Sequence, residues 1–257
     1  MVVYSKQLIV FDLDGTLAES KSGISPEMAS SLIKLIARKK VAIISGGGYP
    51  QFQAQLLSYL PQNTENFSNL FLIPTSGTRL YAWKGSWNEQ YVEHLSIKEK
   101  EKIMIALNAS LKQGGYVQPQ KIYGPIFEDR GSQITFSALG QQAPGLEKKA
   151  WDPTREKREA ISAFLQPKLP EFDVRIGGST SIDITKKGVN KAFGIRRLEE
   201  YLKLTSDDIV FVGDALFPGG NDYPARATGV DCIMVNGPED TRKLIESWVG
   251  SEDTNDL

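Results

Sequence analysis

The chain has almost none of the residues on which thiol and imidazole chemistry depend, since its 257 residues include one cysteine and one histidine. Cys232 cannot form an internal disulfide, and its apolar surroundings VDCIMV indicate a buried, reduced thiol. Zinc sites built from several Cys and His ligands are excluded by this count. His94 stands alone in a polar stretch, which leaves Ser–His and phosphohistidine chemistry without a helper residue. Hydrolytic chemistry must therefore come from carboxylates, hydroxyls, lysine or a hard metal ion.

An excess charge of one sign and long apolar runs are also missing. The 30 Lys and Arg residues nearly balance the 31 Asp and Glu residues, and the formal net charge is −1. No sequence-wide basic field is available to hold a phosphate backbone, so we expect no nucleic-acid partner. No apolar run approaches the roughly 20 residues that span a bilayer, and the N-terminal stretch meets an acid too early to serve as a signal peptide. We expect a cytoplasmic protein that does not enter membranes.

The first part of the chain alternates apolar strands with amphipathic helices. The predicted strands lie at 6–11, 41–45 and 69–73, and the predicted helices at 26–39 and 50–60. Ser25, Pro26 and Glu27 supply an N-cap, a proline at the first helical position and an early acid. Because the strands are continuously apolar rather than alternating, the pattern predicts a doubly wound parallel sheet covered on both faces, which is an α/β fold.

The pattern changes at about residue 79 and returns at Val189. The intervening segment predicts a hairpin at 79–92, helices at 97–113 and 153–165, and strands at 132–138, 172–178 and 179–186. After it come a helix to Lys203, strands at 209–214 and 231–235, and a helix after Pro238. We therefore predict a core of residues 1–83 and 187–257, with an α+β insert at 84–186. The polar tail at 251–257 is expected to fray.

Acidic side chains stand where the predicted first strand ends. Asp12 and Asp14 follow it directly, at the carboxyl edge where doubly wound sheets bind ligands. Gly15 lets the chain turn, so that both carboxylates can face one pocket. One carboxylate could then bind a hard cation and act as a nucleophile, while the other transfers protons. The alternative is a pair of aspartates that only cap a turn or a helix.

Two further strand ends and a helix start add polar groups to the same edge. Ser45 and Gly46 offer a hydroxyl and amides suited to phosphate oxygens. The later candidates are Lys191, Asp214, Asn221 and Asp222. An oxygen-only set of this kind suits Mg²⁺. For Lys191 taken alone, the default interpretation is a solvated helix lysine.

These motifs carry a family resemblance. DLDGT, the ISG strand end, Lys191 and VGDALFPGGND match, in order and spacing, the four motifs of the haloacid dehalogenase-like phosphotransferase superfamily. The insert position is that of members with the larger α/β cap, known as type IIB. SIDITKKGVNK, GDALFPGGND and NGPEDTRKL resemble stretches of eukaryotic-type phosphomannomutases and of related sugar-phosphate phosphatases. The resemblance implies a Rossmann-like core with an inserted cap that determines substrate specificity.

Catalytic roles follow from this resemblance together with the chemistry of the residues. It implies that Asp12 is the nucleophile and forms an aspartyl-phosphate, while Mg²⁺ and Lys191 neutralise charge. Asp14 would donate a proton to the leaving oxygen and later remove one from the acceptor.

The same resemblance implies where the metal and the phosphoryl group are held. The metal site would comprise Asp12, Asp14 through its backbone carbonyl, and Asp214, with Asp222 and Asn221 orienting the ligands. Ser45 and the amide of Gly46 would hold phosphoryl oxygens.

Substrate recognition is expected in the insert. The resemblance assigns the family's Gly-Gly-x-x-Ser-x-Asp strand to Gly178, Ser181 and Asp183, and its first cap arginine to Arg130. A surface ion pair or strand-end capping is the alternative interpretation for Arg130, Ser181 and Asp183. The second cap arginine of phosphomannomutases is replaced by Gln141, which cannot form a bidentate cationic clamp.

This departure favours a phosphatase. A mutase must hold a bisphosphorylated intermediate in two orientations, whereas a phosphatase need not. The sequence thus predicts a Mg²⁺-dependent phosphohydrolase acting on a small-molecule phosphate ester, most simply a phosphorylated sugar, as a monomer or homodimer. The alternatives are a phosphomannomutase-type sugar phosphomutase and a non-catalytic phosphate-binding module.

Overall fold

The computed structural model describes residues 5–62 and 65–250 and divides the chain into two compact units. One unit, the core, runs to Val92 and resumes at Asn190, and the other, the insert, comprises Glu93–Val189. The tail predicted at 251–257 lies outside the described residues. Among the residues described, no helix combines the length and the apolar character needed to cross a bilayer.

The core is built on a seven-stranded sheet with the order β11-β10-β1-β2-β3-β4-β5. Its parallel strands are β1 (Leu8–Asp12), β2 (Lys40–Ile44), β3 (Leu70–Ile73), β10 (Ile209–Gly213) and β11 (Asp231–Met234). An antiparallel hairpin, β4 (Arg79–Trp83) and β5 (Trp87–Val92), extends one edge. The predicted α/β class with a doubly wound sheet is confirmed.

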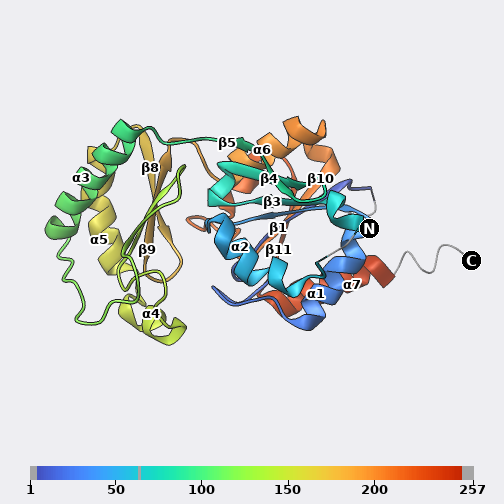
Figure 1. Ribbon diagram of the computed structural model, residues 1–257, viewed down its shortest axis with the longest axis horizontal. Coiled ribbons are helices and arrows are strands. Elements are labelled where there is room, and N and C mark those ends of the chain that lie inside the picture. The colour runs from blue at the N-terminus through green and yellow to red at the C-terminus, as the bar shows by residue number, and fades with distance from the viewer. Residues whose placement is uncertain (1–4, 63–64, 251–257) are drawn as a thin grey trace, which may run out of the picture. The chain divides into compact units, whose positions relative to one another are not determined.

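Helices cover both faces of this sheet, as the unbroken apolar strands predict. Alternate residues of β1 point to opposite faces, with Ile9 and Phe11 in one buried cluster and Leu8 and Val10 in the other. The first face is covered by α1 (Pro26–Ile36), α2 (Tyr49–Gln55) and α7 (Pro238–Gly250), and the second by α6 (Lys191–Leu202). In Figure 1, α1 and α7 lie side by side within the core.

The hairpin at 79–92 was expected in the insert, and this expectation is wrong. β4 pairs antiparallel with β3, matching Phe71 with Ala82 and Leu72 with Tyr81. Leu80 and Ala82 are buried against the α6 side of the core. The units therefore meet in sequence at 92/93 and 189/190 rather than at 83/84 and 186/187. Alternating polarity identifies an antiparallel strand but does not indicate which sheet it joins.

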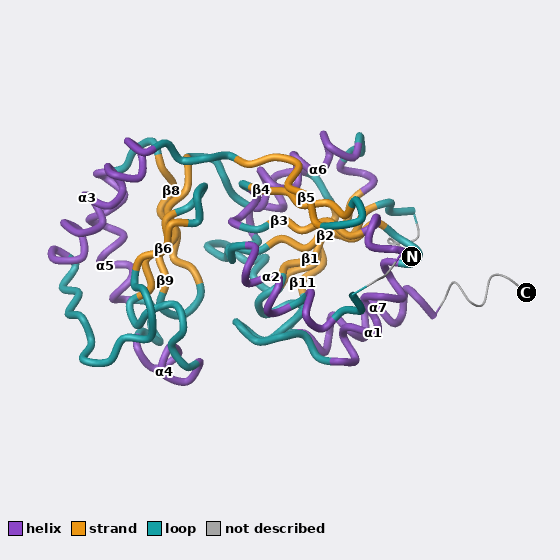
Figure 2. Tube along the Cα trace, in the orientation of Figure 1, coloured by secondary structure: helices purple, strands orange, loops and turns teal. Residues whose placement is uncertain are grey.

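The insert contains a four-stranded antiparallel sheet with the order β6-β7-β9-β8. The strands are β6 (Phe127–Asp129), β7 (Ile134–Ser137), β8 (Phe172–Gly177) and β9 (Ser181–Lys186), and the helices α3 (Ile97–Gln113), α4 (Gly145–Trp151) and α5 (Glu156–Leu165). Figure 2 shows α3 and α5 on the same side of this sheet. Phe136, Ile182 and Ile184 pack there with apolar residues of both helices. Neither α4 nor β6 was predicted, since both are short.

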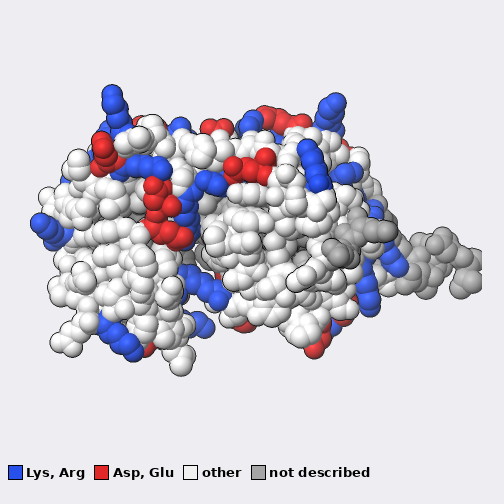
Figure 3. Space-filling view, in the orientation of Figure 1, with Lys and Arg blue, Asp and Glu red and all other residues white. Residues whose placement is uncertain are grey.

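The opposite face of the insert sheet is polar. Register places Glu128, Thr135, Asp183 and Arg175 in one row across all four strands. On the face of the molecule drawn in Figure 3, cationic and anionic side chains are interspersed, in agreement with the balanced composition.

Candidate active site

Three strand ends converge at one edge of the core sheet. β1 lies between β10 and β2, and the chain winds outward from β1 in both directions, first through β2 and β3 and later through β10 and β11. Such a switch point opens a crevice at the carboxyl ends of the strands. Asp12 ends β1, Ser45 follows β2, and Asp214 follows β10, so the topology brings these polar side chains to one edge as predicted.

Three carboxylates form a compact cluster at this edge. One oxygen from each of Asp12, Asp214 and Asp222 lies within 4.8 Å of the other two. Asp12 and Asp222 are buried, and Asp214 is half-buried. The Asp222 carboxylate accepts a hydrogen bond of 3.0 Å from the backbone N–H of Ala215. A Cβ on Gly213 would lie 2.4 Å from the Asp222 Oδ2 atom, so only glycine leaves room for this carboxylate.

Lys191 supplies the positive charge of the cluster. It is the first residue of α6, whose N-cap Asn190 accepts a 3.1 Å hydrogen bond from the N–H of Phe193. The Lys191 ammonium donates to Asp12 Oδ1 at 2.5 Å and also to Asp222 Oδ1. Its side chain is only 3% exposed. The alternative of a solvated helix lysine is therefore wrong.

The electrostatics of the cluster show a shortage of positive charge. Burial raises the pKa of Asp12 well above its ordinary value, and this effect outweighs the opposing charge of Lys191. Burial and the charge of Asp222 raise the pKa of Asp214. Burial lowers the pKa of Lys191, but the two carboxylates around it outweigh burial and raise this pKa. Three carboxylates against one ammonium leave two uncompensated negative charges when all are ionised.

This donor set fits a divalent cation. Oxygen ligands from a few carboxylates are the arrangement in which proteins hold Mg²⁺, which keeps several waters. Added positive charge would also oppose the effect of burial, and relieve the smaller repulsion from Asp222, which together raise the pKa values of Asp12 and Asp214. The residues that could hold the ion are Asp12, Asp214 and Asp222, with Asn221 exposed directly before Asp222.

Thr16 joins the cluster but was not singled out from the sequence. Its buried hydroxyl lies 3.3 Å from Asp214 Oδ1 and 3.5 Å from Asp12 Oδ2, and it accepts a 3.1 Å hydrogen bond from the N–H of Asp214. It thereby ties the end of β1 to the end of β10. Its place in DLDGT, two residues after Asp14, was the available signal.

Asp14 faces a different set of partners. Its carboxylate accepts hydrogen bonds from the backbone N–H of Lys21 at 2.6 Å, from Gln51 Nε2 at 2.9 Å and from Gln55 Nε2 at 3.3 Å. The structure thus brings Asp12 and Asp14 to the same edge but does not place the Asp14 side chain in the three-carboxylate cluster.

The Ser45 loop is fixed by the loop after β3. Ser45 is buried, its Oγ accepts a 3.1 Å hydrogen bond from the N–H of Gly47, and Gly46 between them is half-buried. The N–H of Thr75 donates to the Gly47 carbonyl at 2.8 Å, and the N–H of Ser76 donates to the Ser45 carbonyl at 2.9 Å. These bonds set the position of the Ser45 hydroxyl at the strand end.

The loop after β3 has an unusual backbone. Thr75, Ser76 and Gly77 have φ values of 53°, 57° and 101°. For a β-branched residue such as Thr75 this is a strained conformation, which persists only where the surroundings enforce it. Gly77 packs directly on Gly194 of α6, where a Cβ on Gly77 would lie 2.7 Å from the Gly194 backbone. The close contact fixes the start of α6 and hence Lys191.

In the insert, Ser181 and Asp183 lie on the polar face of the sheet, and Arg130 directly follows β6. Asp183 accepts a 2.7 Å hydrogen bond from the Thr135 hydroxyl, and Ser181 lies 3.2 Å from the Ser137 hydroxyl. Arg130 forms an ion pair of 2.6 Å with Glu128. These contacts are the ones that the ion-pair and strand-end alternatives predict.

Gly178 stands in the turn between β8 and β9, and a buried ion pair supports this turn. Arg158 donates to the Gly178 carbonyl at 2.5 Å and to the Asp152 carboxylate at 2.7 Å. The Arg158 and Asp152 side chains are 3% and 1% exposed. Sequence reasoning missed this pair, because two charges six residues apart around a helix start carry no recognisable spacing.

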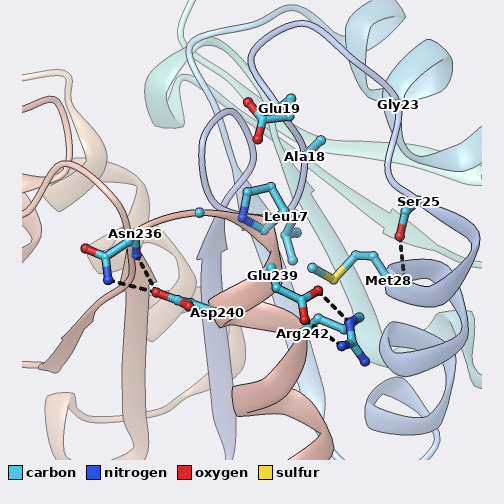
Figure 4. A pocket seen from close by; sticks show the side chains of 12 residues that line it. Leu17, Ala18, Glu19, Gly23, Ser25, Met28, Asn236, Glu239, Asp240 and Arg242 are labelled. Atoms are coloured by element: carbon cyan, nitrogen blue, oxygen red, sulfur yellow. Dashed lines mark hydrogen bonds and ion pairs between the residues drawn. The ribbon is translucent and has the colours of Figure 1, made fainter.

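A pocket of about 410 Å³ is lined by residues that do not belong to the acid cluster. Figure 4 shows Leu17 near the start of α7, where Asn236 forms a hydrogen bond with Asp240, and Ala18 and Glu19 farther from this helix. None of the predicted site residues lines this pocket.

Comparison with known proteins assigns the chain to a family. A sequence model of haloacid dehalogenase-like hydrolases matches residues 9–255, and the chain belongs to this family. A probable phosphomannomutase of Caenorhabditis elegans is 30% identical over 255 residues, which are 95% of each chain. The phosphomannomutase of Schizosaccharomyces pombe is 29% identical over 247 residues, 93% of this chain and 92% of its own.

Solved structures show the same fold. An N-terminally truncated IMP-nucleotidase of Plasmodium falciparum has a TM-score of 0.72 at 17% identity, covering 96% of this chain and 71% of that one. The family and the fold predicted from the motifs are confirmed.

Proposed function

We propose that the chain is a Mg²⁺-dependent phosphohydrolase that moves the phosphoryl group of a phosphorylated sugar, or a similar metabolite, first to Asp12 and then to water. The observation that carries this proposal is the buried contact of Lys191 with two of three clustered carboxylates at the sheet switch point. An anionic nucleophile can approach an anionic phosphate when positive charge lies beside it, and Asp12 has the Lys191 ammonium and a carboxylate set that suits a divalent cation.

In the first step, an Asp12 oxygen attacks phosphorus and the bond from phosphorus to the substrate oxygen breaks. Asp14 gives its proton to that oxygen, so an alcohol leaves and Asp12 carries the phosphoryl group. In the second step, Asp14 takes a proton from water as the water oxygen attacks phosphorus. The bond from phosphorus to Asp12 then breaks and inorganic phosphate leaves.

The charge that rearranges in these steps would have several partners in this chain. Lys191 would keep its contact with Asp12, while the Ser45 hydroxyl and the amide of Gly46 would donate hydrogen bonds to the phosphoryl oxygens. Mg²⁺ held by Asp12, the Asp14 carbonyl, Asp214 and Asp222 would supply Lewis-acid charge to the same oxygens.

The charge on the polar face of the insert supports hydrolysis over isomerisation. Arg130 is paired with Glu128, and Arg175 is paired with Asp173 at 2.7 Å, so both arginines already have carboxylate partners. Asp183 lies in the same row. A mutase needs cations there for the distal phosphate of a bisphosphorylated sugar, since Arg is the side chain that binds phosphate bidentately. We propose that the insert acts as a specificity cap that binds a substrate with one phosphate.

Isomerisation of sugar phosphates is the second candidate. It is favoured by the names of the relatives, which are phosphomannomutases aligned over nearly the whole chain. In that reaction the acceptor of the Asp12 phosphoryl group is a second sugar hydroxyl rather than water.

The two candidates are separated by following both products. Hexose 1- and 6-phosphates are incubated with enzyme and Mg²⁺, with and without a catalytic amount of sugar 1,6-bisphosphate, and phosphate release and isomer formation are measured together. If the protein is a hydrolase, it releases inorganic phosphate both with and without the bisphosphate. Adding the bisphosphate then does not lead to formation of the isomeric hexose phosphate. Faster isomer formation than phosphate release would establish the mutase.

A further inference from the structure

Asp14 is held by three N–H donors on the side of α2 rather than by the acid cluster. Both of its oxygens accept hydrogen bonds, Oδ1 from the Lys21 N–H at 2.6 Å and from Gln55 at 3.3 Å, and Oδ2 from Gln51 at 2.9 Å. Gln51 and Gln55 are four residues apart on α2, so both point from one face of the helix toward Asp14.

The two oxygens are held unequally. Gln55 is 4% exposed, and its amide nitrogen donates to the Ser22 carbonyl at 2.7 Å as well as to Asp14 Oδ1. The backbone carbonyl of Gln55 accepts a 2.9 Å hydrogen bond from the N–H of Ile24. Gln55 thus fixes the loop that carries Lys21 and, through it, one oxygen of Asp14. Gln51 is half-buried, and among the described residues it is the single donor to Oδ2.

We propose that Gln55 and Gln51 are positioning residues for the acid and base Asp14, with Oδ1 as the anchored oxygen and Oδ2 as the one that exchanges the proton. This rests on the role given to Asp14 in the proposed function. Gln51 occupies Oδ2 until the substrate oxygen takes its place. The proton on Oδ2 then moves to the leaving oxygen as the phosphorus–oxygen bond breaks, and the carboxylate returns to its two-sided contact with the amides.

Two substrates with different leaving groups distinguish a loss of positioning of the general acid from a structural defect of the active site. An alkyl ester of a sugar hydroxyl needs a proton from Asp14 as its bond breaks, whereas a nitrophenyl ester leaves readily as the anion. The kcat/KM value reports the steps through phosphoryl transfer to Asp12. Loss of positioning therefore lowers kcat/KM for the alkyl ester selectively, while a structural defect lowers both.

The test compares Gln55→Met and Gln51→Met with a matched control, Gln53→Met, which changes an exposed glutamine of the same helix. Release of alcohol from a hexose 6-phosphate and of nitrophenol from 4-nitrophenyl phosphate is measured with Mg²⁺. A well-placed general acid contributes about 10²- to 10⁴-fold, so we expect Gln55→Met to lose about 10- to 100-fold on the alkyl ester and less than about 3-fold on the aryl ester. For Gln51→Met we expect a loss of about 3- to 10-fold, again only on the alkyl ester. Gln53→Met should match the wild type.

A double-mutant cycle completes the test. Asp14→Ala should show the same selective loss, and adding Gln55→Met to it should change kcat/KM no further, because the group being positioned is gone. Equal losses on both esters, additive losses in the double variant, or unchanged alkyl kcat/KM in both folded glutamine variants would overturn the positioning role. If the wild type releases neither alcohol nor nitrophenol, the proposed function itself is wrong, and that result is distinct from the three others.

Discussion

The Lys191 ammonium and the Asp12 carboxylate are 179 residues apart in sequence and form a 2.5 Å hydrogen bond in a buried site. The contact joins the end of the first strand to the start of the helix that follows the insert. It depends on the packing of α6 against the loop after β3, because this packing fixes the first turn of the helix. The catalytic roles proposed above require this contact.

Replacing Lys191 tests its electrostatic role. Lys191→Met leaves Asp12 and Asp222 buried without their ammonium partner, and breaking a buried ion pair in this way costs about 3–5 kcal/mol of unfolding free energy. Part of this loss should return when Mg²⁺ is added, since a cation replaces the missing charge. Chemical denaturation with and without Mg²⁺ measures both effects. Lys34→Met, at an exposed position of α1, serves as the control, and equal destabilisation of the two variants would contradict the role of Lys191.

The raised pKa values of Asp12 and Asp214 predict a pH-dependent response to Mg²⁺. Without a divalent cation, the folded protein binds more protons than the unfolded chain, so unfolding free energy from this site is lost as pH rises through the raised pKa values. Mg²⁺ binds the ionised carboxylates and therefore restores the unfolding free energy that is lost at high pH. The rise in Tm caused by Mg²⁺ should therefore be larger at about pH 8 than at about pH 5.

Asp214→Asn is the control for the metal response. It removes one ligand and one of the like charges, so the Tm without Mg²⁺ should be less sensitive to pH and the Mg²⁺-induced rise should be lost. A Tm rise that is independent of pH, or that survives in Asp214→Asn, would mean that the ion binds elsewhere.

The close contact of Gly77 and Gly194 predicts a large effect of one added methyl group. Gly77→Ala introduces a Cβ 2.7 Å from backbone atoms of Gly194 at a φ of 101°, so backbone strain and steric clash add. Gly85→Ala is a matched control, with a φ of 79° and no atom within 4 Å of the added Cβ. We expect a loss of about 1 kcal/mol for Gly85→Ala and of about 3 kcal/mol or more for Gly77→Ala, measured by chemical denaturation. Similar losses would show that α6 is not fixed by this contact.

The sequence predicts which polar residues gather at one edge of the core sheet, because the topology places them there. Asp12, Ser45 and Asp214 each end or follow an apolar strand, and parallel strands bring their carboxyl ends to one edge. The hairpin at 79–92 was placed in the wrong unit, since its alternation is compatible with any antiparallel partner. Its pairing with β3 depends on tertiary contacts of Leu80 and Ala82 with the core.

The supporting contacts were harder to foresee. Gln51 and Gln55 have a helical spacing that places them on one face, but a glutamine pair carries no information about which carboxylate it meets. Arg158 and Asp152 form a buried ion pair, and the pattern of charges in the sequence does not indicate which charged residues are buried. Supporting residues of this kind are identified only when the folded structure shows which groups lie beside them.

The central claim is that Asp12 carries the phosphoryl group, and rapid-quench trapping of the phosphoenzyme tests it most directly. Enzyme with Mg²⁺ is mixed with a ³²P-labelled sugar phosphate, quenched in acid, digested and mapped by mass spectrometry. We predict a hydroxylamine-labile phosphoryl group on the peptide containing Asp12, formed at a rate sufficient for turnover. In Asp12→Asn we predict its absence together with a fall in kcat of about 10³-fold or more. Undiminished turnover in Asp12→Asn, or a phosphoryl group found on another residue, would contradict the account.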